Sequence, residues 1–173
     1  MKNKEVKIFV ISDTHFSHIE KMFEYCNRPK DYEEKILKAM KEIPENDVLL
    51  HLGDICIGND LENHDKYIKP LKCKKWLVLG NHDNNSRSWY LRNGWDFVCY
   101  EFTDTYYSKK ILFSHKPSQR IEDVDLNIHG HLHNSDFRRY EPQMKGILTD
   151  KHKLVALEHL DYKPILLRTF LNG

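Results

Sequence analysis

Five short polar strings in the sequence hold residue types that bind divalent metal ions. In chain order they are Asp13-Thr14-His15, Gly53-Asp54, Gly80-Asn81-His82-Asp83, Ser114-His115 and Gly130-His131-Leu132-His133. Carboxylate, amide and imidazole groups of this kind suit Mn, Fe and Zn ions. A single Asp or His would indicate little. An ordered set predicts a two-metal site that hydrolyses phosphate esters.

The spacing within two of these strings suits chelation. Asp13 and His15 are two positions apart, so on an extended backbone both side chains point the same way, as two ligands of one ion must. His131 and His133 repeat this spacing, and Gly130 lets the backbone come close to the site. Either pair alone occurs often by chance, whereas both pairs at successive strand ends indicate a metal site.

Apolar runs precede most of the polar strings and predict the elements that position them. Strands are expected at residues 6–12, 47–52 and 75–79, and helices at 19–26, 31–43 and 61–68. This alternation, with runs apolar on both faces, predicts a parallel sheet covered by helices. Ligands of such sheets gather at the carboxyl ends of the strands, which is where the polar strings fall.

The second half of the chain has short segments rich in aromatic and β-branched residues. Strands are expected at residues 96–102, 105–107, 110–114, 124–129 and 154–158, with a tight turn at Ser108-Lys109 and a closing helix over 165–171 that Pro164 begins. The sequence contains no internal repeat, low-complexity segment or linker. We therefore predict one domain over residues 1–173.

Composition limits the classes of partner. The chain has 27 basic and 26 acidic residues and a net charge of +1, which argues against a nucleic-acid-binding tail or a membrane-attracting basic block. Its four cysteines form no C-x-x-C pair, and no apolar signal segment stands at the N-terminus. Reduced thiols and a cytoplasmic location are expected, with no membrane partner.

On these motifs the chain resembles the calcineurin-like metallophosphoesterases, whose pattern is D-x-H, G-D, G-N-H-[DE], H and G-H-x-H. All five elements occur here in order. The opening Asp13-Thr14-His15-Phe16-Ser17-His18, with Tyr25-Cys26-Asn27-Arg28-Pro29, is also similar to a small bacterial and phage-type subgroup of that superfamily. The resemblance implies an α/β fold, a four-layer α/β/β/α sandwich of two mixed sheets.

The resemblance also implies a role for each polar residue. Asp13, His15 and His133 would bind one ion, Asn81, His115 and His131 a second, Asp54 would bridge both, and His82 would be the catalytic proton donor. The ions would be two divalent metals, Mn most naturally, with Fe, Zn or Ni as alternatives. With two divalent ions, two carboxylates and a bridging hydroxide, the net charge of the site would be roughly +1. This charge attracts phosphate yet lets the product leave.

The expected reaction is attack of metal-bound hydroxide on phosphorus. Bound metals lower the pKa of water toward about 7, so hydroxide is available at neutral pH. His82 would protonate the leaving oxygen. Asp83 is a candidate for orienting His82, although an acid next in sequence often points elsewhere.

Departures from the family pattern narrow the substrate. Where Ser/Thr protein phosphatases of the superfamily carry an Asp and a phosphate-binding Arg after the Gly-Asp element, this chain has Ile57 and Gly58. Without that bidentate Arg, selectivity for a phosphate dianion should be weaker. A phosphodiester or a small, nucleotide-like phosphorylated substrate is therefore favoured. Substitute cations would come from Arg28, Arg87, Lys116, Arg120, Arg138 or Arg139, with Arg138 and Arg139 the first choice, and His18 is a further candidate for binding substrate.

Two other functions compete with this one. A metal-dependent nuclease would use the same chemistry on DNA, RNA or a short nucleic acid, but the near-neutral charge counts against strong duplex binding. A non-catalytic scaffold, such as the retromer subunit with this fold, typically loses ligands or the catalytic histidine. Here none of these residues is missing, so an enzyme is favoured. The sequence leaves the oligomeric state open.

Overall fold

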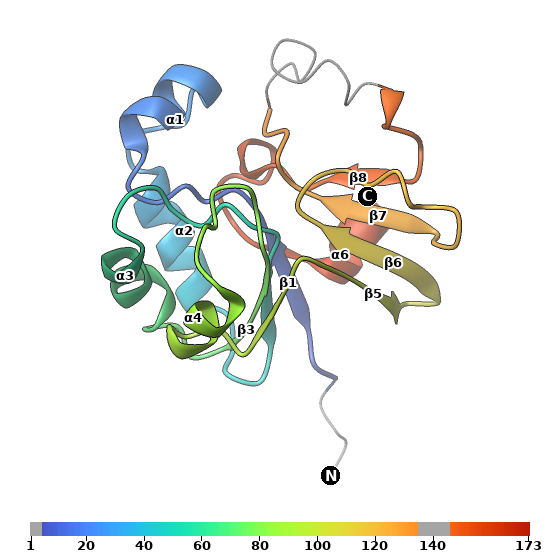
Figure 1. The fold of residues 1–173 in the computed structure, drawn as a ribbon, viewed down its shortest axis with the longest axis horizontal. Coiled ribbons are helices and arrows are strands. Elements are labelled where there is room, and N and C mark those ends of the chain that lie inside the picture. Colours follow the sequence, from blue (N-terminus) through green and yellow to red (C-terminus); the bar gives the residue numbers. More distant parts are fainter. Residues whose placement is uncertain (1–4, 135–145) are drawn as a thin grey trace.

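The computed structural model describes residues 5–134 and 146–173, whose strands form two sheets (Figure 1). The first sheet has the order β4-β3-β2-β1-β9 and the second the order β5-β6-β7-β8. The strands of the first sheet are β1 (Ile8–Ile11), β2 (Val48–His51), β3 (Lys74–Val78), β4 (Phe97–Cys99) and β9 (Ile165–Leu166). Those of the second are β5 (Glu101–Tyr106), β6 (Lys109–Ser114), β7 (Leu126–His129) and β8 (His152–Leu154).

Both sheets are mixed. Strands β1 to β4 run parallel, while β9 pairs antiparallel with β1. In the second sheet β5 is antiparallel to β6, and β6, β7 and β8 run parallel. The α/β sandwich of two mixed sheets that the sequence predicts is therefore confirmed.

Helices cover the face of the first sheet that points away from the second sheet (Figure 1). They are α1 (Ile19–Cys26), α2 (Tyr32–Lys41), α3 (Asp60–Asn63), which continues into a π-helical turn (His64–Ile68), and α4 (Arg87–Arg92). A 3₁₀ turn (Leu157–His159) and α6 (Leu167–Asn172) follow the second sheet. None of the helices among the described residues is long and apolar enough to cross a bilayer.

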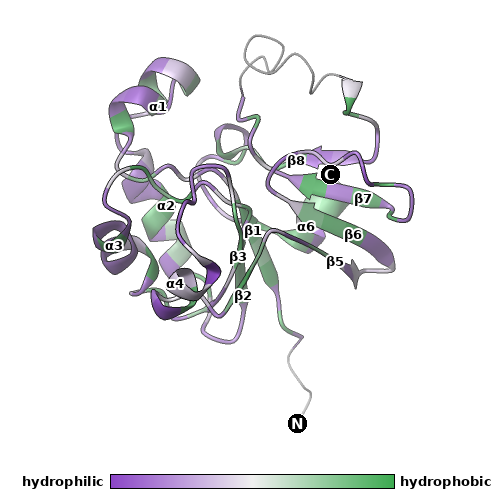
Figure 2. Ribbon diagram, in the orientation of Figure 1, coloured by the Kyte–Doolittle hydropathy of each residue, from purple (hydrophilic) through white to green (hydrophobic). Residues whose placement is uncertain are grey.

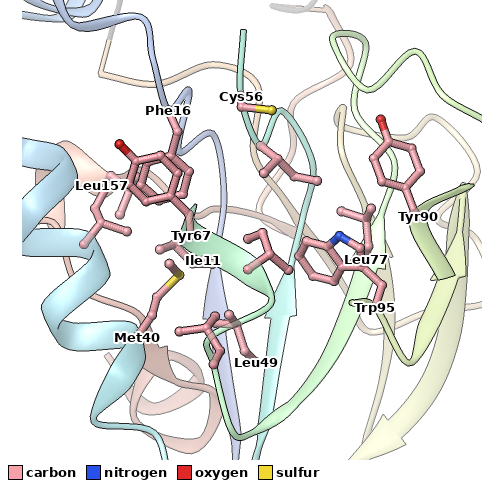
Figure 3. Packing of buried hydrophobic residues seen from close by; sticks show 14 of the residues in the cluster. Ile11, Phe16, Met40, Leu49, Cys56, Tyr67, Leu77, Tyr90, Trp95 and Leu157 are labelled. Carbon is pink, nitrogen blue, oxygen red and sulfur yellow. The ribbon is translucent and has the colours of Figure 1, made fainter. Parts of the chain in front are cut away.

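Alternate residues of the central strands serve two separate cores. Ile11 and Leu49 pack with Met40 of α2 on the helix side (Figure 3). Val10 and its partner Leu50 pack between the two sheets, against residues such as Phe113. Because successive side chains of a strand point to opposite faces, burial of both faces requires the continuous apolar runs seen in the sequence. Figure 2 shows the central strands of the first sheet, β1 for example, as largely hydrophobic and most loops as hydrophilic.

An aromatic pair fixes the loop after β1 on the helix layer. The Phe16 and Tyr67 rings are stacked, with centroids 3.9 Å apart and planes 5° from parallel (Figure 3). Both side chains are buried. Phe16 therefore anchors the segment that carries Asp13 and His15 to the helix layer.

The sequence predicted strands over 96–102 and 105–107, but the structure divides this segment at a different place. The chain leaves the first sheet after Cys99 and enters the second at Glu101, and β5 then runs without interruption to Tyr106. The β5–β6 turn lies at Tyr107 and Ser108, both with positive φ, one residue earlier than expected. Most residues around the switch are aromatic or β-branched and favour strands, so the local pattern does not show where one sheet ends and the next begins.

Three further elements differ from the expectation. Strand β8 ends at Leu154, where the last strand was expected to start, and a 3₁₀ turn replaces the rest of it. Ile165 and Leu166 join the first sheet as β9 before the closing helix begins. Helix α4 was not expected; the Ser86 hydroxyl caps it by accepting a hydrogen bond from Trp89 N.

Candidate metal centre

The five polar strings follow β1, β2, β3, β6 and β7 and lie against one another. Two backbone hydrogen bonds join the first two loops: Asp13 N donates to Gly53 O at 2.9 Å, and His15 N to Asp54 O at 3.1 Å. The last two loops are joined in the same way, because Gly130 N donates to His115 O at 2.9 Å. The sheet order thus brings together motifs that are far apart in the sequence.

Six of the predicted ligands form two groups. The first ligand group is Asp13, His15 and His133, and the second ligand group is Asp54, His115 and His131. Within each group the candidate ligand atoms all lie within 4.8 Å of one another. In the first group, Asp13 Oδ1 is 3.8 Å from His15 Nε2 and 3.7 Å from His133 Nε2.

Asp54 and Asn81 complete this arrangement. Asp54 Oδ2 lies 3.3 Å from His115 Nε2 in its own group and 3.7 Å from His15 Nε2 in the first group. This carboxylate therefore faces both groups. Asn81 Oδ1 lies 3.1 Å from His115 Nε2, so all seven predicted ligands adjoin the same centre.

The backbone at these ligands is left-handed rather than extended. Asp13, His15, Asp54, His131 and His133 have φ values of 54°, 44°, 57°, 70° and 49°. The expectation that Asp13 and His15 converge because their backbone is extended is therefore wrong; the chain turns at each of them. Each such conformation costs about 1–3 kcal/mol in a residue other than glycine, and such residues cluster at functional sites.

Glycines stand where the loops approach one another closely. A Cβ at Gly80 would collide with the Asp54 side chain and backbone. A Cβ at Gly130 would collide with Ser12 and with the Asp13 carboxylate. The expectation that Gly130 lets the backbone come close to the site therefore has a direct steric basis.

The first ligand group contains buried polar atoms that no protein atom satisfies. Asp13 Oδ2 accepts hydrogen bonds from Ser12 Oγ (2.5 Å) and His131 N (2.8 Å), whereas Asp13 Oδ1 is buried without a partner among the described residues. Both ring nitrogens of His15 are likewise buried without a hydrogen-bond partner among the described residues. Leaving such groups unpaired costs about 1–3 kcal/mol each. A divalent ion fits here, since it would satisfy Asp13 Oδ1 and one nitrogen of His15 together.

A backbone carbonyl fixes the tautomer of His115. His115 Nδ1 lies 2.7 Å from Leu52 O, and a carbonyl oxygen only accepts, so Nδ1 carries the hydrogen of the neutral ring. His115 Nε2, which faces Asp54 and Asn81, is then the nitrogen free to bind an ion.

The carboxylates make the centre attractive to positive charge. Burial opposes protonation of His115, but its hydrogen bond to Asp54 and the charge of Asp13 raise its pKa to about 9. Burial likewise opposes protonation of His133, and Asp13 nonetheless raises its pKa to about 10. The pKa of Asp54 is lowered despite its burial, through the hydrogen bond and charge of His115 and the charge of His15. Protons and metal ions therefore compete for the same atoms.

Asp83 does not orient His82. Its carboxylate accepts backbone hydrogen bonds from Gly80 N (2.7 Å), Asp54 N (2.8 Å) and Ile55 N (3.1 Å). Burial raises the pKa of this carboxyl to about 6. In return, Asp54 Oδ1 accepts a hydrogen bond from His82 N at 2.8 Å. Asp83 thus joins the two loops that carry Asp54, Asn81 and His82.

The predicted proton donor and one predicted substrate ligand lie beside His15. The exposed His82 ring meets the His15 ring edge-on, with centroids 5.4 Å apart, and the His18 ring is 6.4 Å from His15. His18 Nδ1 is buried without a hydrogen-bond partner among the described residues. Burial, His82 and Lys21 together lower the pKa of His18, so this imidazole is neutral at pH 7.

The cations expected to bind substrate have different outcomes. Arg138 and Arg139 lie outside the described residues. Arg28 is fully buried and donates to Glu158 Oε1 at 2.8 Å and to Thr14 O at 3.2 Å, so its proposed contact with substrate is wrong. Arg28 is close in sequence to the first polar string. The residues around it, however, do not indicate that its side chain is buried behind the site.

Sequence reasoning also missed residues that support the loops. His51 Nδ1 accepts a hydrogen bond from Gly53 N (3.1 Å), and its Nε2 lies 3.0 Å from Thr14 Oγ1, which donates to Ile55 O (2.7 Å). Burial lowers the pKa of His51 to about 3, so the ring stays neutral. Its position at the end of a strand, two residues before Gly53, is the sequence feature that could have indicated this supporting role.

Two hollows open beside the candidate metal centre. One has a volume of about 390 Å³ and is lined by residues that include Asn81, Tyr100, His115 and Lys116. The other has a volume of about 310 Å³ and is lined by residues that include His129, His133, Thr149, His152 and His159. The first hollow therefore reaches two of the predicted ligands, Asn81 and His115, and the second reaches His133.

A family model and several known proteins are similar to this chain. The family model for calcineurin-like phosphoesterases matches residues 6–163. The chain is 27% identical over 172 residues to uncharacterized protein MJ1445 of Methanocaldococcus jannaschii, covering 93% of this chain and 87% of that protein. A protein of unknown function from Aquifex aeolicus, AQ665, has a crystal structure with a TM-score of 0.74 and 28% identity, over 97% of this chain and 99% of that one. A novel archaeal phosphodiesterase shares the fold at a TM-score of 0.50 and 16% identity, over 87% and 82% of the two chains.

Proposed function

The chain belongs to the calcineurin-like phosphoesterase family, and we propose that it is a metal-dependent enzyme that hydrolyses a phosphodiester or a small nucleotide-like phosphate ester. The observation that carries this proposal is the position of Asp54 Oδ2. This atom lies within 3.7 Å of a histidine nitrogen in each ligand group, as a carboxylate shared by two ions must. The orphaned atoms of Asp13 and His15 support the same conclusion.

The chain would hold two divalent ions, Mn²⁺ being the natural choice for this mixture of oxygen and nitrogen donors. The ligands would be Asp13, His15 and His133 for one ion, Asn81, His115 and His131 for the other, and Asp54 for both. When bound, such ions supply hydroxide at neutral pH and neutralise charge on the phosphate. The protein's part is to fix the ligands through loops that are hydrogen-bonded to one another.

His82 is proposed as the proton donor to the leaving oxygen. Its ring is exposed beside His15, where a substrate oxygen can reach it. A well-placed acid contributes about 10²–10⁴-fold to the rate. The neutral His18 on the same side is placed to donate a hydrogen bond to a phosphate oxygen.

Features of the surroundings support a diester or nucleotide-like substrate. Ile57 and Gly58 stand where an Asp and a phosphate-binding Arg would favour a phosphate monoester, and Arg28 is buried. The hollow beside Asn81 is bordered by Tyr100, which is 69% exposed and offers a ring on which a base can stack. The archaeal protein of the same fold is a phosphodiesterase, which agrees with this choice.

The test uses purified protein stripped of metal and reconstituted with Mn²⁺. We expect bis-p-nitrophenyl phosphate to be hydrolysed at least about tenfold faster than p-nitrophenyl phosphate, a difference of about 1.4 kcal/mol in barrier. Chelation and Asp54→Asn should each abolish turnover. Faster cleavage of single-stranded DNA than of small diesters would instead support the nuclease. Absence of turnover with Mn²⁺, Fe²⁺, Zn²⁺ and Ni²⁺ would contradict an enzymatic function.

A further inference from the structure

A buried ion pair lies behind His133, on the side of the ring away from Asp13. Arg28 Nε donates to Glu158 Oε1 at 2.8 Å, and the two side chains are 0% and 4% exposed. Arg28 follows α1, whereas Glu158 lies in the 3₁₀ turn near the end of the chain. Desolvating two charges is costly, so a pair buried this deeply calls for an explanation beyond stability.

Both side chains of the pair lie close to Nδ1 of the His133 ring. His133 Nε2 faces Asp13 Oδ1, at 3.7 Å. His133 Nδ1 lies 3.5 Å from Glu158 Oε1, and it lies 3.1 Å from Arg28 Nη2, from which it can accept a hydrogen bond only while it carries no hydrogen itself. A neutral imidazole that binds an ion through Nε2 carries its hydrogen on Nδ1 and must donate it. Arg28 has no acceptor, so Glu158 is the side chain here that can receive this hydrogen.

The same arginine also supports the other two residues of the first ligand group. Arg28 Nη1 donates to the carbonyl oxygen of Thr14, which stands between Asp13 and His15. Its guanidinium lies over the Tyr32 ring, at 5.1 Å, and the Tyr32 hydroxyl donates to His15 O at 2.6 Å. One buried cation thus links the loop of Asp13 and His15 to the partner of His133.

A third metal site in this corner is a competing explanation. Cys26, His133 and Glu158 have donor atoms within 4.8 Å of one another. However, the guanidinium of Arg28 contacts both His133 and Glu158 and brings a fixed positive charge to that position. The arginine therefore takes the place that an ion would need, and the corner belongs to the layer behind the first ligand group.

We propose that Glu158 is a positioning residue for the first ligand group: it accepts the Nδ1 hydrogen of His133, so that Nε2 faces the ion, and Arg28 holds Glu158 in place. This proposal rests on the proposed function, in that the first ligand group binds a divalent ion. The second ligand group does not depend on Glu158, because Leu52 O performs the equivalent task for His115. Loss of an outer partner of this kind typically lowers metal affinity about 10–100-fold.

The experiment is a calorimetric titration of the metal-free protein with Mn²⁺, with bound Mn²⁺ counted by electron paramagnetic resonance. We expect Glu158→Gln to weaken one of two Mn²⁺ sites, by up to about 10-fold because the amide oxygen still accepts, and to leave the other unchanged. The matched control is Asp161→Asn, three residues away. Asp161 pairs with Lys163 at 2.6 Å, and both side chains are well exposed, so this variant should bind Mn²⁺ as the wild type does.

A second variant guards against misfolding. Arg28→Met combined with Glu158→Leu removes both charges, so no unpaired charge is left buried, and such replacements are commonly tolerated. We expect it to fold, to bind one Mn²⁺ as the wild type does, and to lose about 10–100-fold in affinity at the other site. Two wild-type sites in both variants would overturn this proposal and leave the proposed function standing. A wild-type protein that binds no Mn²⁺ would overturn both.

Discussion

Replacing Asp83 with alanine is expected to destabilise the protein and loosen the candidate metal centre. The Asp83 carboxylate accepts hydrogen bonds from the backbone N–H groups of Gly80, Asp54 and Ile55. Each buried donor left without a partner costs about 1–3 kcal/mol. Because Asp83 is half-buried, water can reach part of the gap, and we expect a loss of about 2–5 kcal/mol in the free energy of unfolding. Domains of this kind are stable by only about 5–15 kcal/mol.

The matched variant is Asp83→Asn. Its carbonyl oxygen can still accept from Gly80 and Asp54, so its loss should be limited to about 1–2 kcal/mol. Urea denaturation of the metal-free protein measures both losses, with an unchanged m-value if only stability has changed. A Mn²⁺ titration of folded Asp83→Ala should also show weaker binding, because the loops of Asp54 and Asn81 then lose the Asp83 hydrogen bonds and keep the one from His82 N to Asp54 Oδ1.

Two outcomes of the Asp83→Ala measurements would contradict this prediction. If Asp83→Ala unfolds within about 0.5 kcal/mol of the wild type, the three hydrogen bonds do not hold the loops. If, in addition, activity falls only on substrates with poor leaving groups, Asp83 acts through His82 after all. The wild-type geometry predicts instead that Asp83→Ala lowers activity on every substrate alike.

Three other expectations follow from the same geometry. His82→Ala should keep both Mn²⁺ ions but lose about 10²–10⁴-fold in kcat on alkyl diesters, and less on p-nitrophenyl diesters; a variant that loses an ion would show that His82 is a ligand. Mn²⁺ affinity should rise with pH up to about 9 to 10, because His115 and His133, whose pKa values are raised to about 9 and 10, must first release their protons. Calorimetry in two buffers should therefore detect proton release at pH 7, and an affinity that is flat from pH 6 to 9 would contradict this. Gly130→Ala should lower the free energy of unfolding in urea by about 1–3 kcal/mol, since its Cβ would collide with Ser12 and Asp13, whereas Gly146→Ala, whose Cβ would meet no atom of the described residues within 4 Å, should cost much less.

The first half of the fold was predictable because its signals are local. The buried runs that become β1, β2 and β3 are continuous, and each is followed by a polar loop. The second half lacks such boundaries. The change of sheet at Tyr100 depends on whether β3 or β6 is the available partner, which is a long-range choice that residues 97–106 do not encode.

The candidate ligands were predictable for a similar reason, whereas their support was not. Each predicted ligand stands in a short motif directly after a strand, and the sheet order brings these motifs together. Glu158 reaches His133 only through tertiary packing, and Arg28, its partner, lies 130 residues earlier. The left-handed backbone at Asp13 and His15 was missed because spacing alone does not determine dihedral angles.

The most direct test of a two-metal centre is anomalous diffraction from crystals of the Mn²⁺-bound protein. We expect two peaks, one among Asp13, His15 and His133 and the other beside His115 and His131. Asp54 should coordinate both ions, as its distances to the two groups imply. A single peak, or a Asp54 carboxylate that contacts only one ion, would contradict the account of a shared carboxylate at the centre of this site.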